Sequence, residues 1–99
     1  LKTVWRKCYT ARAYDNGMFV IANNQVGHAG DEPETNHAGG ILVFDPNGDV
    51  IAESQTQRFT EEMVVARLRA RAYKARRTGC CFNLQTRRPE VYGDLCTGD

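Results

Sequence analysis

The chain has 99 residues, of which 41% are hydrophobic and 25% are charged, and its formal net charge is +1. This length and balance fit one small globular domain with a single core and exclude an intrinsically disordered chain. A net charge near zero gives no global field that favours nucleic acid or a membrane surface, and no apolar run is long enough to span a bilayer.

Residues 1–16 have the spacing of an amphipathic helix. The stripe consists of Leu1, Val4, Trp5, Cys8 and Tyr9 and continues through Arg12 and Ala13. Asn16-Gly17 ends the helix, because glycine readily adopts the left-handed conformation beyond a helix end. Since the pattern is already in phase at Leu1, which is not a methionine, we expect this sequence to be a piece of a longer chain. The aromatic side chains of the stripe serve either the core or a subunit interface.

An apolar strand follows the helix. Met18 to Ala22 is continuously apolar, which predicts a strand buried on both faces. Asn23-Asn24-Gln25 then supplies amide side chains that either line a site or satisfy a loop. Residues 26–38 are polar and acidic in the middle, and they predict an exposed loop.

The next segment predicts a hairpin. Gly40 to Phe44 is apolar, and Val50 to Ala52 returns as its partner strand. Between them lies Asp45-Pro46-Asn47-Gly48, in which Asp suits the first turn position, Pro presets the second and Gly takes the position that needs a positive φ.

Residues 61–77 fit two structures. Thr60 as a helix cap, with Glu61 and Glu62 in the first turn, predicts one long helix, and the pattern slightly favours it. The β-favouring run Met63-Val64-Val65 and the alternation up to Arg69 fit a strand instead. After Thr78 the chain is predicted to be irregular.

The cysteines indicate no metal site. Cys8, Cys80, Cys81 and Cys96 contain no C-x-x-C pair, and His28 and His37 complete no zinc signature. We therefore expect no cofactor, and reduced thiols in a cytoplasmic protein. Cys80-Cys81 with either histidine would suggest a thiol hydrolase, but we favour two small buried apolar residues.

A cluster of basic residues supports a rival function. The segment Arg67–Arg77 contains five arginines, Lys74 and Tyr73, and clustered arginines beside an aromatic side chain bind phosphate backbones or single strands. Acidic residues elsewhere, at Asp31, Glu32, Glu34, Asp45 and Asp49, balance this charge. We therefore favour a solvated face and expect no nucleic-acid or membrane partner.

The ordered motifs resemble the carbon–nitrogen hydrolases of the nitrilase superfamily. The matching positions are the helix end Ala11–Asn16, the strand Phe19–Asn23, Gly27, the turn at Asp45, Pro46 and Gly48, the returning strand Val50–Glu53, and Arg87, Arg88, Pro89 and Tyr92. One position departs from the family, since Ile41 follows Gly39-Gly40 where a polar residue is usual.

The resemblance implies an α/β fold, as the C-terminal portion of a four-layer α-β-β-α sandwich with about four strands and one or two helices. All of residues 1–99 would belong to one carbon–nitrogen hydrolase domain. It also implies a strand near residues 62–69 and a short helix from Ala70.

The resemblance further implies hydrolysis of a non-peptide carbon–nitrogen bond in a small amide, carbamoyl-amine or nitrile substrate. The family uses a Cys nucleophile, a Glu base and a Lys, and none of them maps onto this chain, since Cys8 lies within a helix pattern. We therefore expect no catalytic residue here and an inactive segment when it is alone. The family's subunit contacts imply a homo-oligomer with Trp5, Tyr9 and Arg12 at the interface. A non-catalytic structural domain remains the other alternative.

Overall fold

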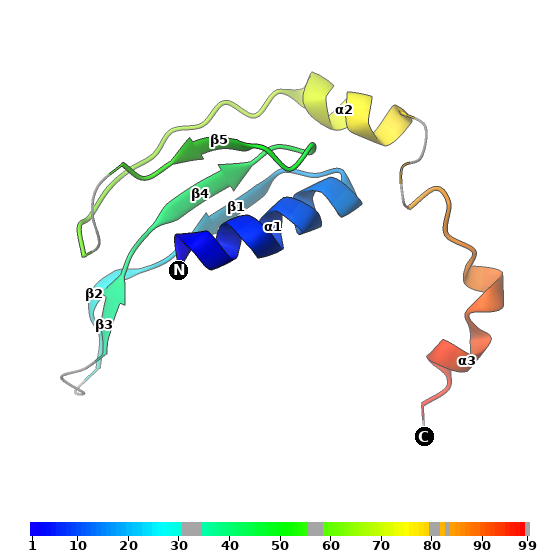
Figure 1. Cartoon of the computed structure of the whole chain (residues 1–99), viewed down its shortest axis with the longest axis horizontal. Helices are drawn as coiled ribbons and strands as arrows, with labels where there is room; N and C mark the ends of the chain where they lie inside the picture. Colours follow the sequence, from blue (N-terminus) through cyan, green and yellow to red (C-terminus); the bar gives the residue numbers. More distant parts are fainter. Residues whose placement is uncertain (31–34, 56–58, 80–81, 83, 99) are drawn as a thin grey trace.

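The structure is a computed structural model that describes residues 1–30, 35–55, 59–79, 82 and 84–98. Its elements are α1 (Lys2–Asn16), β1 (Val20–Asn23), β2 (Val26–His28), β3 (Asn36–Ala38), β4 (Ile41–Phe44), β5 (Val50–Glu53), α2 (Ala70–Thr78), the 3₁₀ turn η1 (Pro89–Val91) and α3 (Gly93–Cys96) (Figure 1). The predicted α/β class is therefore confirmed. The described residues form five strands and three α-helices, and the sequence patterns give no signal for β2, β3 or α3.

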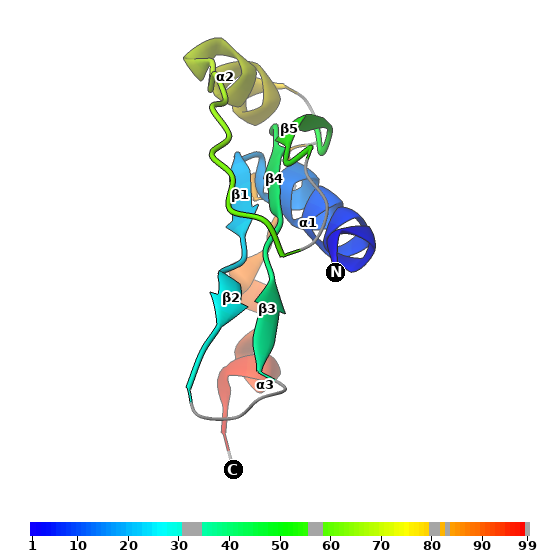
Figure 2. The same cartoon turned by 90° about the vertical axis from the view of Figure 1, so that its left-hand side faces the viewer.

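A three-stranded antiparallel sheet in the order β1-β4-β5 carries α1 on one face (Figure 2). The core is small and lies between them: Ala13 of α1 packs against Leu42 and Phe44 of β4, and all three are fully buried. Side chains alternate along a strand, so Leu42 and Phe44 share the face that α1 covers. The intervening Val43 belongs to the opposite face.

The end of α1 agrees with the prediction. Gly17 adopts φ 57° and ψ 45°, and its N–H and that of Met18 donate to the carbonyls of Tyr14 and Ala13. This left-handed cap satisfies carbonyls that the last turn of a helix leaves without partners. The chain can then reverse directly into β1.

The predicted hairpin turn is also confirmed. Gly48 has φ 85°, its N–H donates to the Asp45 carbonyl at 2.9 Å, and the Asp45 side chain accepts from the Asn47 N–H at 2.9 Å. The acid at the first turn position thus replaces a backbone partner, which is why Asp favours that position.

The loop predicted over residues 26–38 is wrong at both ends of the segment. β2 pairs with β3 in antiparallel register from Val26↔Ala38 to His28↔Asn36. Backbone hydrogen bonds from Asn24 to Gly40 and from Gly39 to Gln25 continue the β1–β4 pairing into this ribbon. Backbone hydrogen bonds between the two strands hold the segment in a ribbon despite its polar composition. Its acidic residues 31–34 lie outside the described residues.

Residues 61–69 form neither of the two predicted structures, the long helix or the strand. The segment is extended without a strand partner, and α2 begins at Ala70, where the resemblance placed it. Val64 and Val65 are β-branched, which disfavours a helix at these positions. A strand needs a hydrogen-bonding neighbour, and the described residues offer none to Met63–Leu68.

Two further expectations are corrected. β1 is not buried on both faces, since Met18 precedes the strand at 41% exposure and Ile21 is 58% exposed. The face opposite α1 is covered only in part, since Val43 of β4 is 3% exposed there. The tail is not wholly irregular, because η1 and α3 form there, and the Tyr92 hydroxyl accepts from the Arg88 N–H at 3.1 Å.

Candidate functional site

A pocket of about 260 Å³ opens where the start of α1 meets the ends of the sheet. Its walls come from several segments, namely Leu1–Thr3, Asn24, Val26, residues 38–41, Ser54, Thr60 and Glu62. The polar groups that reach it are an ammonium, an amide, hydroxyls and a carboxylate.

Ser54 is the best-buried polar residue of this pocket, at 6% exposure. Its hydroxyl accepts hydrogen bonds from the Ile41 N–H at 3.1 Å and from Lys2 Nζ at 3.2 Å, and its carbonyl accepts from Lys2 Nζ at 3.0 Å. Ser54 therefore joins the edge of the sheet to the first turn of α1. Burial without partners would cost free energy, and these bonds remove that cost.

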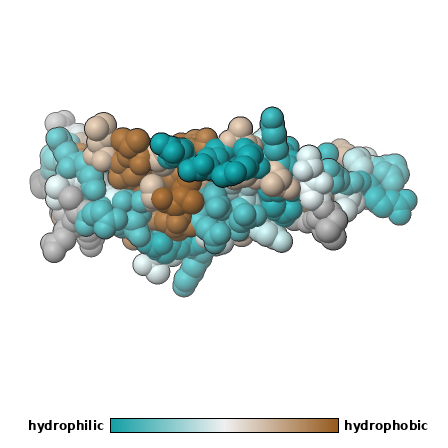
Figure 3. Space-filling view, turned by 90° about the horizontal axis from the view of Figure 1, so that it is seen from above, coloured by the Kyte–Doolittle hydropathy of each residue, from teal (hydrophilic) through white to brown (hydrophobic). Residues whose placement is uncertain are grey.

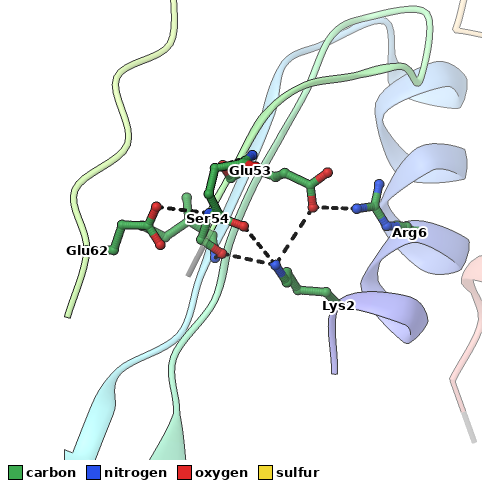
Figure 4. Close-up of polar contacts among 7 residues, drawn as sticks. Lys2, Arg6, Glu53, Ser54 and Glu62 are labelled. Atoms are coloured by element: carbon green, nitrogen blue, oxygen red, sulfur yellow. Dashed lines mark hydrogen bonds and ion pairs between the residues drawn. The ribbon is translucent and has the colours of Figure 1, made fainter. Parts of the chain in front are cut away.

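Glu53 lies beside this contact and forms two ion pairs (Figure 4). Its Oε2 is 2.5 Å from Arg6 Nη2 and 3.7 Å from Lys2 Nζ. The hydrogen bond from Arg6, with the positive charges of Arg6 and Lys2, lowers the pKa of the Glu53 carboxyl below its usual value. Glu53 is thus an anion that holds α1 to β5 and is not poised to act as a base.

Two other polar residues of the pocket support loops. Glu62 Oε1 accepts from the Gln55 N–H at 2.9 Å, and the Asn24 side chain donates to the Gly39 carbonyl at 3.4 Å. The sequence left open whether the amides after β1 line a site or satisfy a loop, and Asn24 does both. The pocket is therefore held together by its own polar residues.

This arrangement suits binding better than bond cleavage. A serine nucleophile needs a base that accepts its proton, and within the described residues no group accepts a hydrogen bond from the Ser54 hydroxyl. Nor do three or more His, Cys, Asp or Glu side chains gather as a metal site in that part of the chain.

The residues predicted at a subunit interface lie on α1. Trp5 and Tyr9 pack against the core of their own chain, with ring centroids 6.2 Å apart from each other and Tyr9 6.3 Å from Phe44. Arg12 is exposed. The structure places the two aromatic residues beneath the outer surface of the helix, and the subunit contact itself stays a prediction.

The other candidates from the sequence do not converge. Cys8 is exposed in the middle of α1, and Cys96 is exposed in α3. Cys80 and Cys81 lie outside the described residues. In the described segments no helix has the length and apolar character that crossing a bilayer requires.

The basic segment makes a specific contact with α1. Arg76 donates to the Tyr14 carbonyl at 3.2 Å, and Arg77 donates to the carbonyls of Asn16 and Gly17 at 2.9 and 3.2 Å. The Arg76 guanidinium also stacks over the Tyr14 ring at 4.3 Å. These two arginines are therefore engaged with the carboxyl end of α1, where positive charge is favoured.

Sequence reasoning missed the contact between Lys2 and Ser54. The two residues are separated by 52 positions, and neither belongs to a motif. From the sequence, Lys2 is predicted to be a solvent-exposed residue of a helix, and Ser54 is predicted to lie at the end of a strand. Only the packing of α1 on the sheet brings them together.

A family model and two curated proteins match this chain. The model of the carbon–nitrogen hydrolase family matches residues 1–77. A protein described as a hydrolase in the agr operon of Staphylococcus aureus is 43% identical over 49 residues, which is 50% of this chain and 18% of that protein. The corresponding protein of Staphylococcus lugdunensis is 38% identical over 52 residues, or 52% of this chain and 21% of that protein.

A solved structure agrees with these matches. The crystal structure of a carbon–nitrogen hydrolase from Helicobacter pylori G27 superposes with a TM-score of 0.73 and 25% identity, covering 97% of this chain and 33% of that one. The chain thus spans about a fifth of the curated relatives and a third of the solved hydrolase. Since the family model accounts for most of its length, the chain belongs to the carbon–nitrogen hydrolase family.

Proposed function

We propose that the protein hydrolyses non-peptide carbon–nitrogen bonds in small amides, carbamoyl amines or nitriles. Residues 1–99 would form the C-terminal segment of its single hydrolase domain. The observation that carries the proposal is the family match over residues 1–77, supported by the superposition on a third of a solved hydrolase.

The bond-breaking groups are proposed to lie in polypeptide outside residues 1–99. A thiolate attacks the carbon of the substrate, a carboxylate moves the proton, and an ammonium group stabilises the developing negative charge, so that one difficult hydrolysis becomes two easier steps. Cys8 does not suit the first role, because its side chain is exposed on the middle of a helix and has no base beside it in the described structure.

We also propose a cytoplasmic homo-oligomer in which the outer surface of α1 takes part in the subunit contact. Val4 is 57% exposed on this helix, and Trp5 and Tyr9 support it from beneath. The unpaired thiols of Cys8 and Cys96 suit a reducing compartment.

A segment exchange tests the function. Residues 1–99 replace the matching third of the Helicobacter pylori hydrolase, and release of ammonia from amides, carbamoyl amines and nitriles is measured. We expect the chimera to hydrolyse one of these classes and Cys8→Ala to leave its rate unchanged.

The same 99 residues fused to a solubilising carrier domain serve as the control, and we expect no turnover from them. Turnover by the carrier fusion that disappears with Cys8→Ala would show that the chemistry lies within this segment. A folded chimera inactive on all three substrate classes would contradict the proposed function.

A further inference from the structure

The sequence contains two Asn-Gly bonds, Asn16-Gly17 and Asn47-Gly48. Asparagine is a chemically labile residue, and a following glycine makes it more so. Glycine has no Cβ to hinder its backbone nitrogen, which can therefore approach the carbonyl carbon of the asparagine side chain. The fold holds the two bonds in different ways, and this difference decides which of them can react.

The Asn16-Gly17 bond is held by contacts with two helices. The Asn16 side chain donates to the Arg12 carbonyl at 2.9 Å, and Arg77 of α2 donates to the carbonyls of Asn16 and Gly17 at 2.9 and 3.2 Å. Gly17 is buried, and a Cβ built on it would lie 2.7 Å from the Phe82 ring. Freeing this bond requires α2 to separate from α1 and the last turn of α1 to unwind.

The Asn47-Gly48 bond lies in the turn that joins β4 to β5 (Figure 1). Asn47 is exposed, and its side chain makes no hydrogen bond within the part of the chain that the structure describes. The N–H of Gly48 donates to the Asp45 carbonyl at 2.9 Å. The N–H groups of Asn47 and Asp49 both donate to Asp45 Oδ1, at 2.9 and 3.0 Å.

A single residue, Asp45, thus restrains the reactive backbone of the turn. Local opening of a surface turn needs less free energy than the separation of packed helices. Opening of this turn breaks the hydrogen bond from the Gly48 nitrogen to Asp45 and leaves the Asn47 side chain, which has no partner to lose, within reach of that nitrogen.

We infer that Asn47 is a site of spontaneous covalent modification, a deamidation in which the Gly48 nitrogen is the nucleophile. After losing its proton to solvent hydroxide, this nitrogen forms a bond to Cγ of Asn47. The bond from Cγ to the side-chain nitrogen breaks, and that nitrogen takes a proton from water and leaves as ammonia. The product is a five-membered cyclic imide, and no oxidant or reductant takes part.

Water then opens the imide at one of its two carbonyl carbons. Opening at Cγ leaves aspartate at position 47, and opening at the main-chain carbon leaves isoaspartate, whose backbone is longer by one methylene group. Water has access because Asn47 is exposed. Hydrophilic residues also flank the hydrophobic middle of the molecule when it is seen from above (Figure 3). The inference does not depend on the proposed function.

The surroundings of the turn leave no space for the longer backbone. Gly48 is buried, and a Cβ built on it would already lie 2.9 Å from the Thr10 carbonyl oxygen of α1. Either product also adds a carboxylate within two residues of Asp45 and Asp49, and like charges repel. Conversion of Asn47 should therefore weaken the contact between this turn and α1.

The test measures both Asn-Gly bonds in the same protein. The chimera and the carrier fusion of residues 1–99 are kept in mildly alkaline buffer, and peptide mapping by mass spectrometry follows the conversion of each asparagine. Labelling with an isoaspartyl methyltransferase identifies the longer product. We expect Asn47 to convert at least about tenfold faster than Asn16 in buffer, and the two rates to agree within about threefold in urea, where the fold no longer restrains either bond.

Two substitutions at Asp45 test its restraint of the turn. Asp45→Ala removes the side-chain acceptor and should raise the conversion rate at Asn47 at least about threefold, whereas Asp45→Asn keeps an acceptor oxygen and should stay within about twofold of the original rate. Asn47→Ser removes the reacting amide. After long incubation the unchanged protein should unfold at a lower urea concentration than before, and Asn47→Ser should not.

Equal conversion of Asn16 and Asn47 in buffer would overturn the inference, because the fold would then not select the site. Asn47 that stays intact in buffer and converts only in urea would also overturn it, since the turn would be closed to the reaction. An equal loss of stability in aged Asn47→Ser would show that deamidation at position 47 does not weaken the contact with α1. None of these readings requires the chimera to be active.

Discussion

Arg77 donates a hydrogen bond from Nη2 to the main-chain carbonyl of Asn16 at 2.9 Å, across 61 positions of the chain. The same guanidinium lies 4.6 Å from the centre of the Tyr73 ring. A cation at the carboxyl end of α1 satisfies carbonyls that the helix leaves free and interacts favourably with the helix dipole. The contact fixes α2 against the last turn of α1.

Replacing Arg77 should therefore loosen α2. Arg77→Gln removes a charged hydrogen-bond donor to two carbonyls, and we expect the free energy of unfolding to fall by about 1–2 kcal/mol. Urea unfolding followed by circular dichroism measures this change. Arg71→Gln is the control, because the Arg71 side chain is exposed and has no partner in the described structure, and it should change stability by less than about 0.5 kcal/mol. Equal effects of the two substitutions would show that the contact contributes nothing.

Tyr9 should be needed for folding of its own chain. Its ring packs against Phe44, and Tyr9→Ala should lower the free energy of unfolding by about 2–3 kcal/mol, since the ring is partly buried. Tyr9→Glu should unfold the protein without a soluble folded protomer. Val4→Glu, on the exposed side of α1, should instead dissociate the proposed oligomer and keep the helical signal.

Size-exclusion chromatography with circular dichroism separates these outcomes. A folded, dissociated protomer from Tyr9→Glu would place Tyr9 in the subunit contact itself. An unchanged oligomer from Val4→Glu would remove the outer surface of α1 from that contact.

Glu53 should make stability depend on pH in the acid range. Because its folded-state pKa is lowered by Arg6 and Lys2, the stabilisation is fully present above the usual value of 4.5 and is lost as the pH falls through the folded-state pKa. The side chain is 32% exposed, so we expect less than about 1 kcal/mol. When unfolding is measured at several pH values, the free energy of unfolding of Glu53→Gln should fall less steeply in acid than that of the unchanged protein.

Arg6→Gln provides the matched control for this ion pair. It should remove most of the same pH dependence, and the double variant should lose little more than either single one. If the losses of stability in Glu53→Gln and Arg6→Gln add up in the double variant, the two side chains act independently. Glu53 would then stabilise the fold through Lys2 and Ser54 instead.

Gly48 should not tolerate a side chain. It has φ 85°, and a Cβ there would lie 2.9 Å from the Thr10 carbonyl oxygen of α1, which is closer than real contacts allow. Gly48→Ala should lower the free energy of unfolding by more than ~1–2 kcal/mol, which is the cost of placing an alanine in the left-handed conformation without a clash. Gly27→Ala is the matched control, since Gly27 has φ 102° and a Cβ there would meet nothing within 4 Å. Thermal unfolding of both variants measures how much stability the clash with Thr10 costs beyond the backbone strain. Equal losses of stability in the two variants would show that the clash has no effect.

Local chemistry explains which elements the sequence determined. The apolar period of residues 1–16 and the stop at Gly17 specify α1, and Asp45 to Gly48 specify the turn, because each signal acts over a few neighbouring residues. The order of these motifs also determined the family, which the match over residues 1–77 confirms. The motif from Arg87 to Tyr92 lies beyond that match, and the structure gives it a local role in the turn.

Tertiary structure decided the features that depend on distant partners. Residues 61–69 carry signals for both helix and strand, and the outcome depends on whether a neighbouring strand is present to take their hydrogen bonds. The contacts of Ser54 with Lys2 and of Arg77 with Asn16 join residues more than 50 positions apart, and no local pattern encodes them. Tyr9 faces its own sheet because α1 docks over Leu42 and Phe44, whereas an amphipathic stripe alone fits a core and an interface equally well.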